Sequence, residues 1–160
     1  MTKKSRNTGT ITNRRARYDY ELGDSLVVGI QLSGAETKAL RFNHGQLHGA
    51  YVNVLGDELW LVGAQISSTS GIPISEQDQT RSRKLLAKRN EIDKLIAARQ
   101  AGSTIVPLEI LTKGRYIKLR IAVGRGKKRY DKRQVLKKRD AARDMSRELR
   151  PRQRPAERKL

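Results

Sequence analysis

Two histidines, His44 and His48, come closest to the spacing of a metal site in this chain. A protein-bound metal needs further ligands, but the chain has no cysteine and no carboxylate pair beside the two histidines. We therefore interpret them as ordinary loop residues. The stretch GRGKK at 124–128 lacks both the spacing of a phosphate-binding loop and the Ser or Thr after its lysine, which indicates a flexible basic hinge. Because no nucleophile has a matching base, we expect no catalysis. Without further ligands for a metal, we expect no metal, and no cofactor either.

Positive charge is the chemistry that the sequence does offer. The 160 residues have a formal net charge of +19 and a sequence pI of about 10.8. Residues 1–17 hold six basic and no acidic residues, residues 18–123 hold 13 basic and 11 acidic, and residues 124–160 hold 16 basic and five acidic. A nearly neutral middle can bury a core, whereas the two ends are too polar to do so. We predict a flexible basic arm over 1–12, one folded domain over 13–123 and a basic tail over 124–160.

Basic ends of this kind can serve solubility, a membrane surface or a nucleic acid. Solubility alone needs far less charge, and the excess is costly through self-repulsion. The tail has few apolar anchors for a membrane surface, and nothing in the chain approaches the ~20 apolar residues of a spanning helix. The start shows no apolar stretch of a signal peptide, and the lack of cysteine fits a reducing compartment. We expect a cytoplasmic protein that binds RNA and no membrane.

The longest helix is predicted over 80–102. Its apolar residues recur at helical spacing, and Thr80 and Gly102 stand where an N-cap and a terminating glycine belong. A shorter helix is predicted over 34–43. Alternating or apolar runs between turn signals predict strands over 25–33, 50–55, 58–66, 103–111 and 116–123.

These elements predict a mainly β protein with helices, of the α+β class. A small antiparallel barrel of the oligonucleotide-binding type with one long helix fits their order, and a ferredoxin-like sandwich fits less well because the order does not repeat. The chain has only seven aromatic residues, and we expect several of them to fill the core. That leaves basic groups to bind the phosphates and shape of a folded RNA rather than its extended bases.

Five stretches resemble the successive signature blocks of the small protein B family, also called SsrA-binding protein. They are NRRARYDY (13–20), GAETKALR (34–41), AYVNVLGDELWL (50–61), TRSRKLLAKRNEIDKLI (80–96) and GRGKKRYDKR (124–133). The resemblance implies an RNA-binding adaptor of trans-translation, which binds the tRNA-like domain of transfer-messenger RNA and delivers it to stalled ribosomes. It also implies help from elongation factor Tu, and a tail that is helical inside the empty messenger channel beside the decoding centre of the small ribosomal subunit.

By the same resemblance, the tRNA-like domain is bound by Asn13, Arg14, Arg15, Leu85 and Lys118. The ribosome-binding tail is expected to use Gly126, Lys127, Lys128, Tyr130, Asp131, Lys132, Arg133, Lys137, Lys138, Arg139, Arg143 and Met145. The chain departs from the family pattern at Val27, where a Glu is common, at Gln65 and at Tyr130, where many members have His. These departures affect the details of RNA contact and leave the assignment intact.

The tail itself has the composition of a helix that forms on binding. Val135, Ala142, Met145 and Leu149 make only a narrow apolar stripe, which is too thin to offset the entropy of ordering. Phosphates would neutralise its lysines and arginines and allow the helix to form, with Pro151 ending it. The rival interpretation is a structural ribosomal protein with basic extensions, which would accompany every ribosome in equal numbers.

Overall fold

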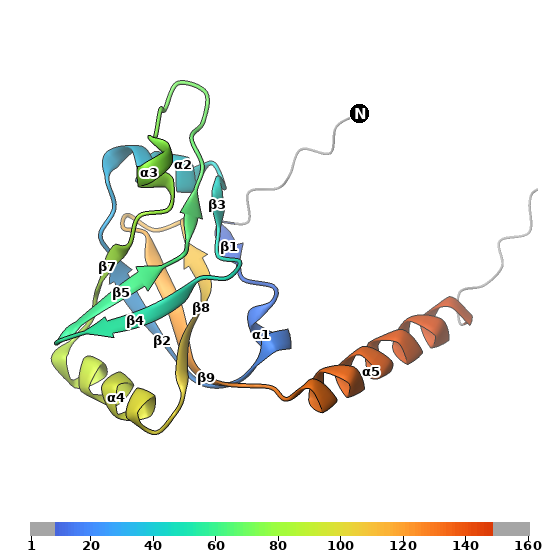
Figure 1. Cartoon of the computed structure of the whole chain (residues 1–160). Coiled ribbons are helices and arrows are strands. Elements are labelled where there is room, and N and C mark those ends of the chain that lie inside the picture. The colour runs from blue at the N-terminus through green and yellow to red at the C-terminus, as the bar shows by residue number, and fades with distance from the viewer. Residues whose placement is uncertain (1–8, 149–160) are drawn as a thin grey trace, which may run out of the picture. The chain divides into compact units, whose positions relative to one another are not determined.

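The computed structural model describes residues 9–148 (Figure 1). The first eight residues of the predicted arm and the tail beyond residue 148, including Leu149 and Pro151, lie outside the described residues. The described residues form two compact units, which divide between Gly126 and Lys127. In chain order the elements are β1 (Thr10–Thr12), α1 (Ala16–Asp19), β2 (Tyr20–Ile30), α2 (Gly34–Arg41), β3 (Gly45–Gln46), β4 (Tyr51–Leu55), β5 (Glu58–Val62), β6 (Gln65–Ile66), α3 (Glu76–Gln79), β7 (Arg83–Leu86), α4 (Arg89–Gln100), β8 (Thr104–Leu111), β9 (Lys118–Gly126) and α5 (Arg129–Glu148).

The main sheet of the first unit closes on itself. Its strands follow the order β1-β8-β4-β5-β7-β2-β9, and β8 also pairs with β9. All of these pairs are antiparallel. The closure confirms the predicted barrel over the ferredoxin-like sandwich, because a sandwich keeps an open sheet with two edges. In Figure 1, α2 and α3 lie at one end of the barrel and α4 lies at the other.

The interior of the barrel is aliphatic. The buried core holds Val, Leu, Ile and Ala side chains, with Val52, Leu59, Ile105, Leu119 and Ile121 among the most deeply buried. The expectation that several aromatic rings fill the core is wrong for the described residues, because no aromatic residue is among the buried ones. A barrel this narrow is filled by branched aliphatic side chains, which pack in layers across its axis.

The predicted helix over 80–102 is wrong in its first half. Residues Arg83–Leu86 form β7, in which Arg83 and Leu85 point inward and Leu86 is 55% exposed. Leu85 pairs with Leu59 of β5 and with Ile30 of β2. The apolar pair at 85 and 86 fits a helical period as well as a strand. Because β5 and β2 both pair with this segment, it forms a strand.

The second half of that prediction is confirmed by α4. The helix begins after Lys88, whose backbone N–H donates to the Glu91 carboxylate at 2.9 Å, rather than after Thr80. It ends before Gly102, which has the positive φ of 83° that favours glycine after a helix.

The predicted helix over 34–43 is α2, and its first turn is capped on both sides. The Glu36 backbone N–H donates to the Ser33 hydroxyl at 3.3 Å, and the Ser33 N–H donates to the Glu36 carboxylate at 2.8 Å. The two predicted hairpins are also present, as β4–β5 and β8–β9. Local signals of this kind are sufficient to place these elements in the sequence.

Candidate nucleic-acid interface

Asn13 joins the start of the domain to the side of the barrel. Its backbone N–H donates to the Leu108 carbonyl at 2.7 Å, and its side-chain Nδ2 donates to the Pro107 carbonyl at 3.0 Å. These carbonyls lie where the β8–β9 ladder changes register, between Pro107 and Glu109. The barrel itself therefore occupies the Asn13 amide, which holds the start of the domain against β8.

Basic residues follow Asn13 in the chain. Arg14, Arg15 and Arg17 are all exposed. Arg15 contacts His48, with Nη1 and Nε2 at 3.2 Å, and both line a hollow of about 310 Å³ beside Asn13. His48, which the spacing of the two histidines led us to interpret as an ordinary loop residue, thus belongs to this surface. Across the described residues, no group of three or more His, Cys, Asp or Glu side chains is arranged to hold a metal ion.

Asn13 also lines a second hollow. It has a volume of about 210 Å³, and Arg17 and Arg120 line it together with Glu109. Arg120, on β9, forms an ion pair with Glu109 of β8. We call the surface formed by Asn13, Arg15, Arg17 and Arg120 the basic corner. It brings together residues from the first signature block and from the last barrel strand.

Lys118 lies on the same strand as Arg120, two residues away, and its side chain is exposed. Side chains two apart on a strand share one face, so Lys118 extends the basic corner along β9. Val27, where the family pattern has Glu, lies opposite Arg120 in the β2–β9 ladder.

Leu85 does not lie on this surface. It is 2% exposed and belongs to the buried core of the barrel. Its side chain therefore cannot contact RNA in this conformation, and any effect of Leu85 on binding would act through the packing of β7. Leu86, the next residue, faces outward.

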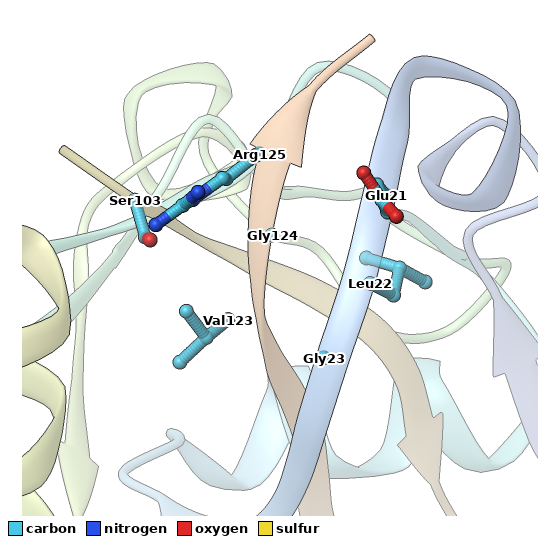
Figure 2. Close-up of a pocket in the computed structure, with 7 residues that line it drawn as sticks. All are labelled: Glu21, Leu22, Gly23, Ser103, Val123, Gly124 and Arg125. Carbon is cyan, nitrogen blue, oxygen red and sulfur yellow. The ribbon is translucent and has the colours of Figure 1, made fainter.

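A third hollow lies at the end of β9, where the chain leaves the barrel (Figure 2). It has a volume of about 320 Å³ and is lined by β2 and β9 residues and by Ser103. Figure 2 shows the Arg125 side chain extending from β9 toward Ser103, while the Glu21 carboxylate lies on the β2 side. Here the β2–β9 ladder is irregular between Leu22 and Ser25. Arg125 adds a cation near the end of β9, just before the tail, and neither the residue patterns nor the resemblance points to it.

Two arginines and a glutamate form a buried charge cluster inside the first unit. Glu36 is 1% exposed, and it accepts hydrogen bonds from Arg81 Nε at 2.8 Å and from Arg83 Nε at 3.0 Å. Arg83 is fully buried, and it also donates to the backbone carbonyls of Ala64, Asp78, Gln79 and Arg81. The cluster fixes the long loop before β7 against α2.

Burial of the Glu36 carboxyl raises its pKa, but hydrogen bonds from Arg81 and the Ser33 backbone and the charges of both arginines outweigh this effect, so the pKa lies below its ordinary value. For Arg83, burial is the larger effect, and it lowers the pKa despite the nearby Glu36. An arginine remains protonated at neutral pH all the same. The cluster therefore keeps one net positive charge.

The second unit contains a single described helix, α5, Arg129–Glu148. Gly126 ends β9 opposite Tyr20, and Lys127 and Lys128 connect it to the helix. The helix holds Tyr130, Asp131, Lys132, Arg133, Lys137, Lys138, Arg139, Arg143 and Met145, and thus all remaining tail residues selected from the sequence. Asp131 lies in the first turn, where a carboxylate is favourable.

Helix α5 forms in the part of the tail that the resemblance predicts to be helical on the ribosome. Its many Lys, Arg, Ala and Glu residues are good helix formers, which accounts for this conformation. Its apolar side chains cover little of one another: Met145 is 63% exposed and Leu136 is 45% exposed. A helix with so little burial is marginal in water.

A closed barrel with a basic corner, followed by a basic helix, defines a nucleic-acid-binding protein of the oligonucleotide-binding class. The family model described as "SmpB protein" matches residues 10–151. The chain belongs to the SmpB family. It is 41% identical over 152 residues to the SsrA-binding protein of Oleidesulfovibrio alaskensis, covering 93% of this chain and 98% of that protein.

Other relatives agree with this assignment. The SsrA-binding protein of Chloroflexus aurantiacus strain J-10-fl is 42% identical over 150 residues, covering 91% of this chain and 93% of the relative. A chain from the solved structure "tmRNA-SmpB: a journey to the center of the bacterial ribosome" superposes with a TM-score of 0.64 and 33% identity. That match covers 80% of this chain and 94% of the solved one. None of the helices in residues 9–148 is both long and apolar enough to span a bilayer.

Proposed function

We propose that this protein is the RNA-binding adaptor of trans-translation, which holds the tRNA-like domain of transfer-messenger RNA and brings it to stalled ribosomes. The observation that carries the proposal is that the family match extends over residues 10–151 and so includes both the basic corner and helix α5. The protein acts by binding rather than by catalysis. It acts on cytoplasmic ribosomes, and elongation factor Tu associates with it by binding the same RNA.

The basic corner is suited to the phosphates of a folded RNA. Arg15, Arg17, Arg120 and Lys118 come from two separate segments, and Asn13 fixes the spacing between them through its bonds to β8. Arginine and lysine side chains on a rigid surface neutralise phosphates and fix the orientation of a folded RNA without reading its sequence. The two hollows that Asn13 lines leave room for the RNA backbone to approach.

Helix α5 is suited to a second, more enclosed site. We propose that it lies in the messenger channel beyond the decoding centre when no message is present. Rows of ribosomal phosphates would neutralise its basic residues and so stabilise a helix that is marginal alone. Binding there would report that the channel is empty.

The experiment that tests the proposal is crosslinking in cells followed by sequencing of the RNA that copurifies with the protein. The expected result is strong enrichment of transfer-messenger RNA, with reads concentrated in its tRNA-like part. The protein should also be substoichiometric and enriched on ribosomes without a message. Equal amounts on every ribosome, with ribosomal RNA as the main crosslinked species, would instead identify a structural ribosomal protein.

Substitution Lys118→Glu tests the surface of β9. It should weaken binding to the tRNA-like RNA and lower the slope of log affinity against log salt by about one to two units, because each phosphate contact contributes about 0.9 to that slope. Titrations at several salt concentrations measure both quantities. Lys94→Glu on α4 is the matched control, because it makes the same charge change at an exposed position that lines neither hollow of the basic corner. Equal effects of the two variants would show that only net charge matters.

A further inference from the structure

Two exposed aromatic side chains lie in segments of the chain that are joined by hydrogen bonds. Phe42 follows the last residue of α2 and is 58% exposed, and Tyr116 lies just before β9 and is 68% exposed. They come from segments more than seventy residues apart, which Arg41 ties together. Its guanidinium donates to the carbonyls of Thr112, Gly114 and Arg115 at 3.3, 3.1 and 3.1 Å.

Arg115 reinforces this arrangement. Its guanidinium carbon lies 5.4 Å from the centre of the Tyr116 ring, which is within the range of a cation–π contact. The contact covers part of the ring with a cation and leaves most of Tyr116 exposed. We call Phe42, Arg115 and Tyr116 the aromatic tip.

The charge around the aromatic tip has one sign. Lys38, Arg41, Lys113, Arg115 and Lys118 lie in the two segments that form it, and neither 37–42 nor 112–118 contains an acidic residue. Exposed rings interleaved with basic groups are typical of surfaces on which bases stack while the backbone is held by cations. The buried Glu36 does not alter this, because Arg81 and Arg83 already compensate it.

We propose that the aromatic tip stacks an unpaired base of the bound RNA. Tyr116 and Lys118 both face outward, with the buried Ile117 between them, so a base on the ring leaves its phosphate within reach of Lys118. The tip thus adds base contact at a single-stranded loop to the phosphate contacts of the basic corner. This inference rests on the proposed function, because it deepens the contact with the same RNA.

Stacking predicts a loss of affinity that does not depend on salt. Tyr116→Ala and Phe42→Ala in the full chain should each weaken binding to a folded transfer-messenger RNA transcript by about 5- to 150-fold, the range for loss of one base–aromatic stack. The slope of log affinity against log salt should stay unchanged, because no phosphate contact is lost. Binding to a fully paired RNA duplex of the same length should also stay unchanged.

Ring-retaining variants are the matched controls. Tyr116→Phe and Phe42→Tyr should bind the transcript within about twofold of the wild type, because every base can stack on either ring. Both positions are exposed, so thermal unfolding should confirm that the alanine variants are folded. Alanine variants that bind the transcript like the wild type, or that lose duplex binding equally, would overturn the stacking proposal. Failure of the wild-type protein to bind the transcript would instead overturn the proposed function.

Discussion

Removal of residues 131–160 should abolish peptide tagging on stalled ribosomes while binding to the tRNA-like RNA stays within about tenfold of the wild type, because the tail adds only salt-sensitive, sequence-independent attraction. The basic corner lies wholly within the first unit, and the buried core residues run from Val28 to Ile121. The truncated chain therefore keeps its fold and its RNA surface. RNA titration and a tagging assay with a message that lacks a stop codon measure the two properties.

A proline variant separates the helix of the tail from its charge. Ala142→Pro in the full chain keeps every basic residue but disrupts α5, at a cost of ~3 kcal/mol in helix stability. Tagging should fall strongly, whereas Ala142→Ser, which is tolerated in a helix, should tag nearly as well as the wild type. If Ala142→Pro is fully active, charge alone drives the tail. If truncation greatly weakens binding to the tRNA-like RNA, the proposal that the barrel alone binds this RNA is wrong.

Most of the barrel could be predicted because its elements carry local signals. Gly56, with φ of 60°, marks the tight turn between β4 and β5, and the capping box of Ser33 and Glu36 marks the start of α2. The strand β7 could not be predicted in the same way. Leu85 and Leu86 fit a helical period as well as a strand, and only the need of β5 and β2 for a partner distinguishes the two.

In the candidate site, too, some features could be predicted from the sequence and others depend on contacts that only the fold creates. The resemblance selected Asn13 and Lys118, but the reason for Asn13 is a pair of bonds to β8, one of them to a residue 94 positions away. No short pattern encodes such a contact. The exposure of Phe42 and Tyr116 could not be predicted either. The number of aromatic residues in a sequence does not show whether the barrel interior has room for their rings.

The buried charge cluster was missed for a related reason. Glu36, Arg81 and Arg83 look like solvated charges on helical segments until the fold places them together. Once there, each charge depends on the others, because an uncompensated buried charge is far more costly than the pair. The long loop before β7 is held by the same arginine, through its bonds to backbone carbonyls.

Glu36→Gln should lower the free energy of unfolding by about 3–5 kcal/mol at pH 7, because it leaves Arg83 buried without a counter-charge. Arg83→Met should cost a similar amount, since it also leaves backbone carbonyls without donors. Arg81→Met should cost far less, because the side chain of Arg81 is 36% exposed and water screens its loss. Urea unfolding followed by circular dichroism measures all three variants.

The pH dependence of the same experiment identifies the charge on Glu36 as the cause. Because the pKa of Glu36 is lowered on folding, its stabilisation is complete above the ordinary value of 4.5 and is lost as the pH falls through the lower folded value. The difference in unfolding free energy between wild type and Glu36→Gln should therefore shrink below about pH 4.5.

The double variant Glu36→Leu with Arg83→Met should recover part of the stability, because a packed apolar pair can replace a buried ion pair. A constant difference across pH, or a double variant no more stable than Arg83→Met alone, would show that shape rather than charge holds this part of the barrel.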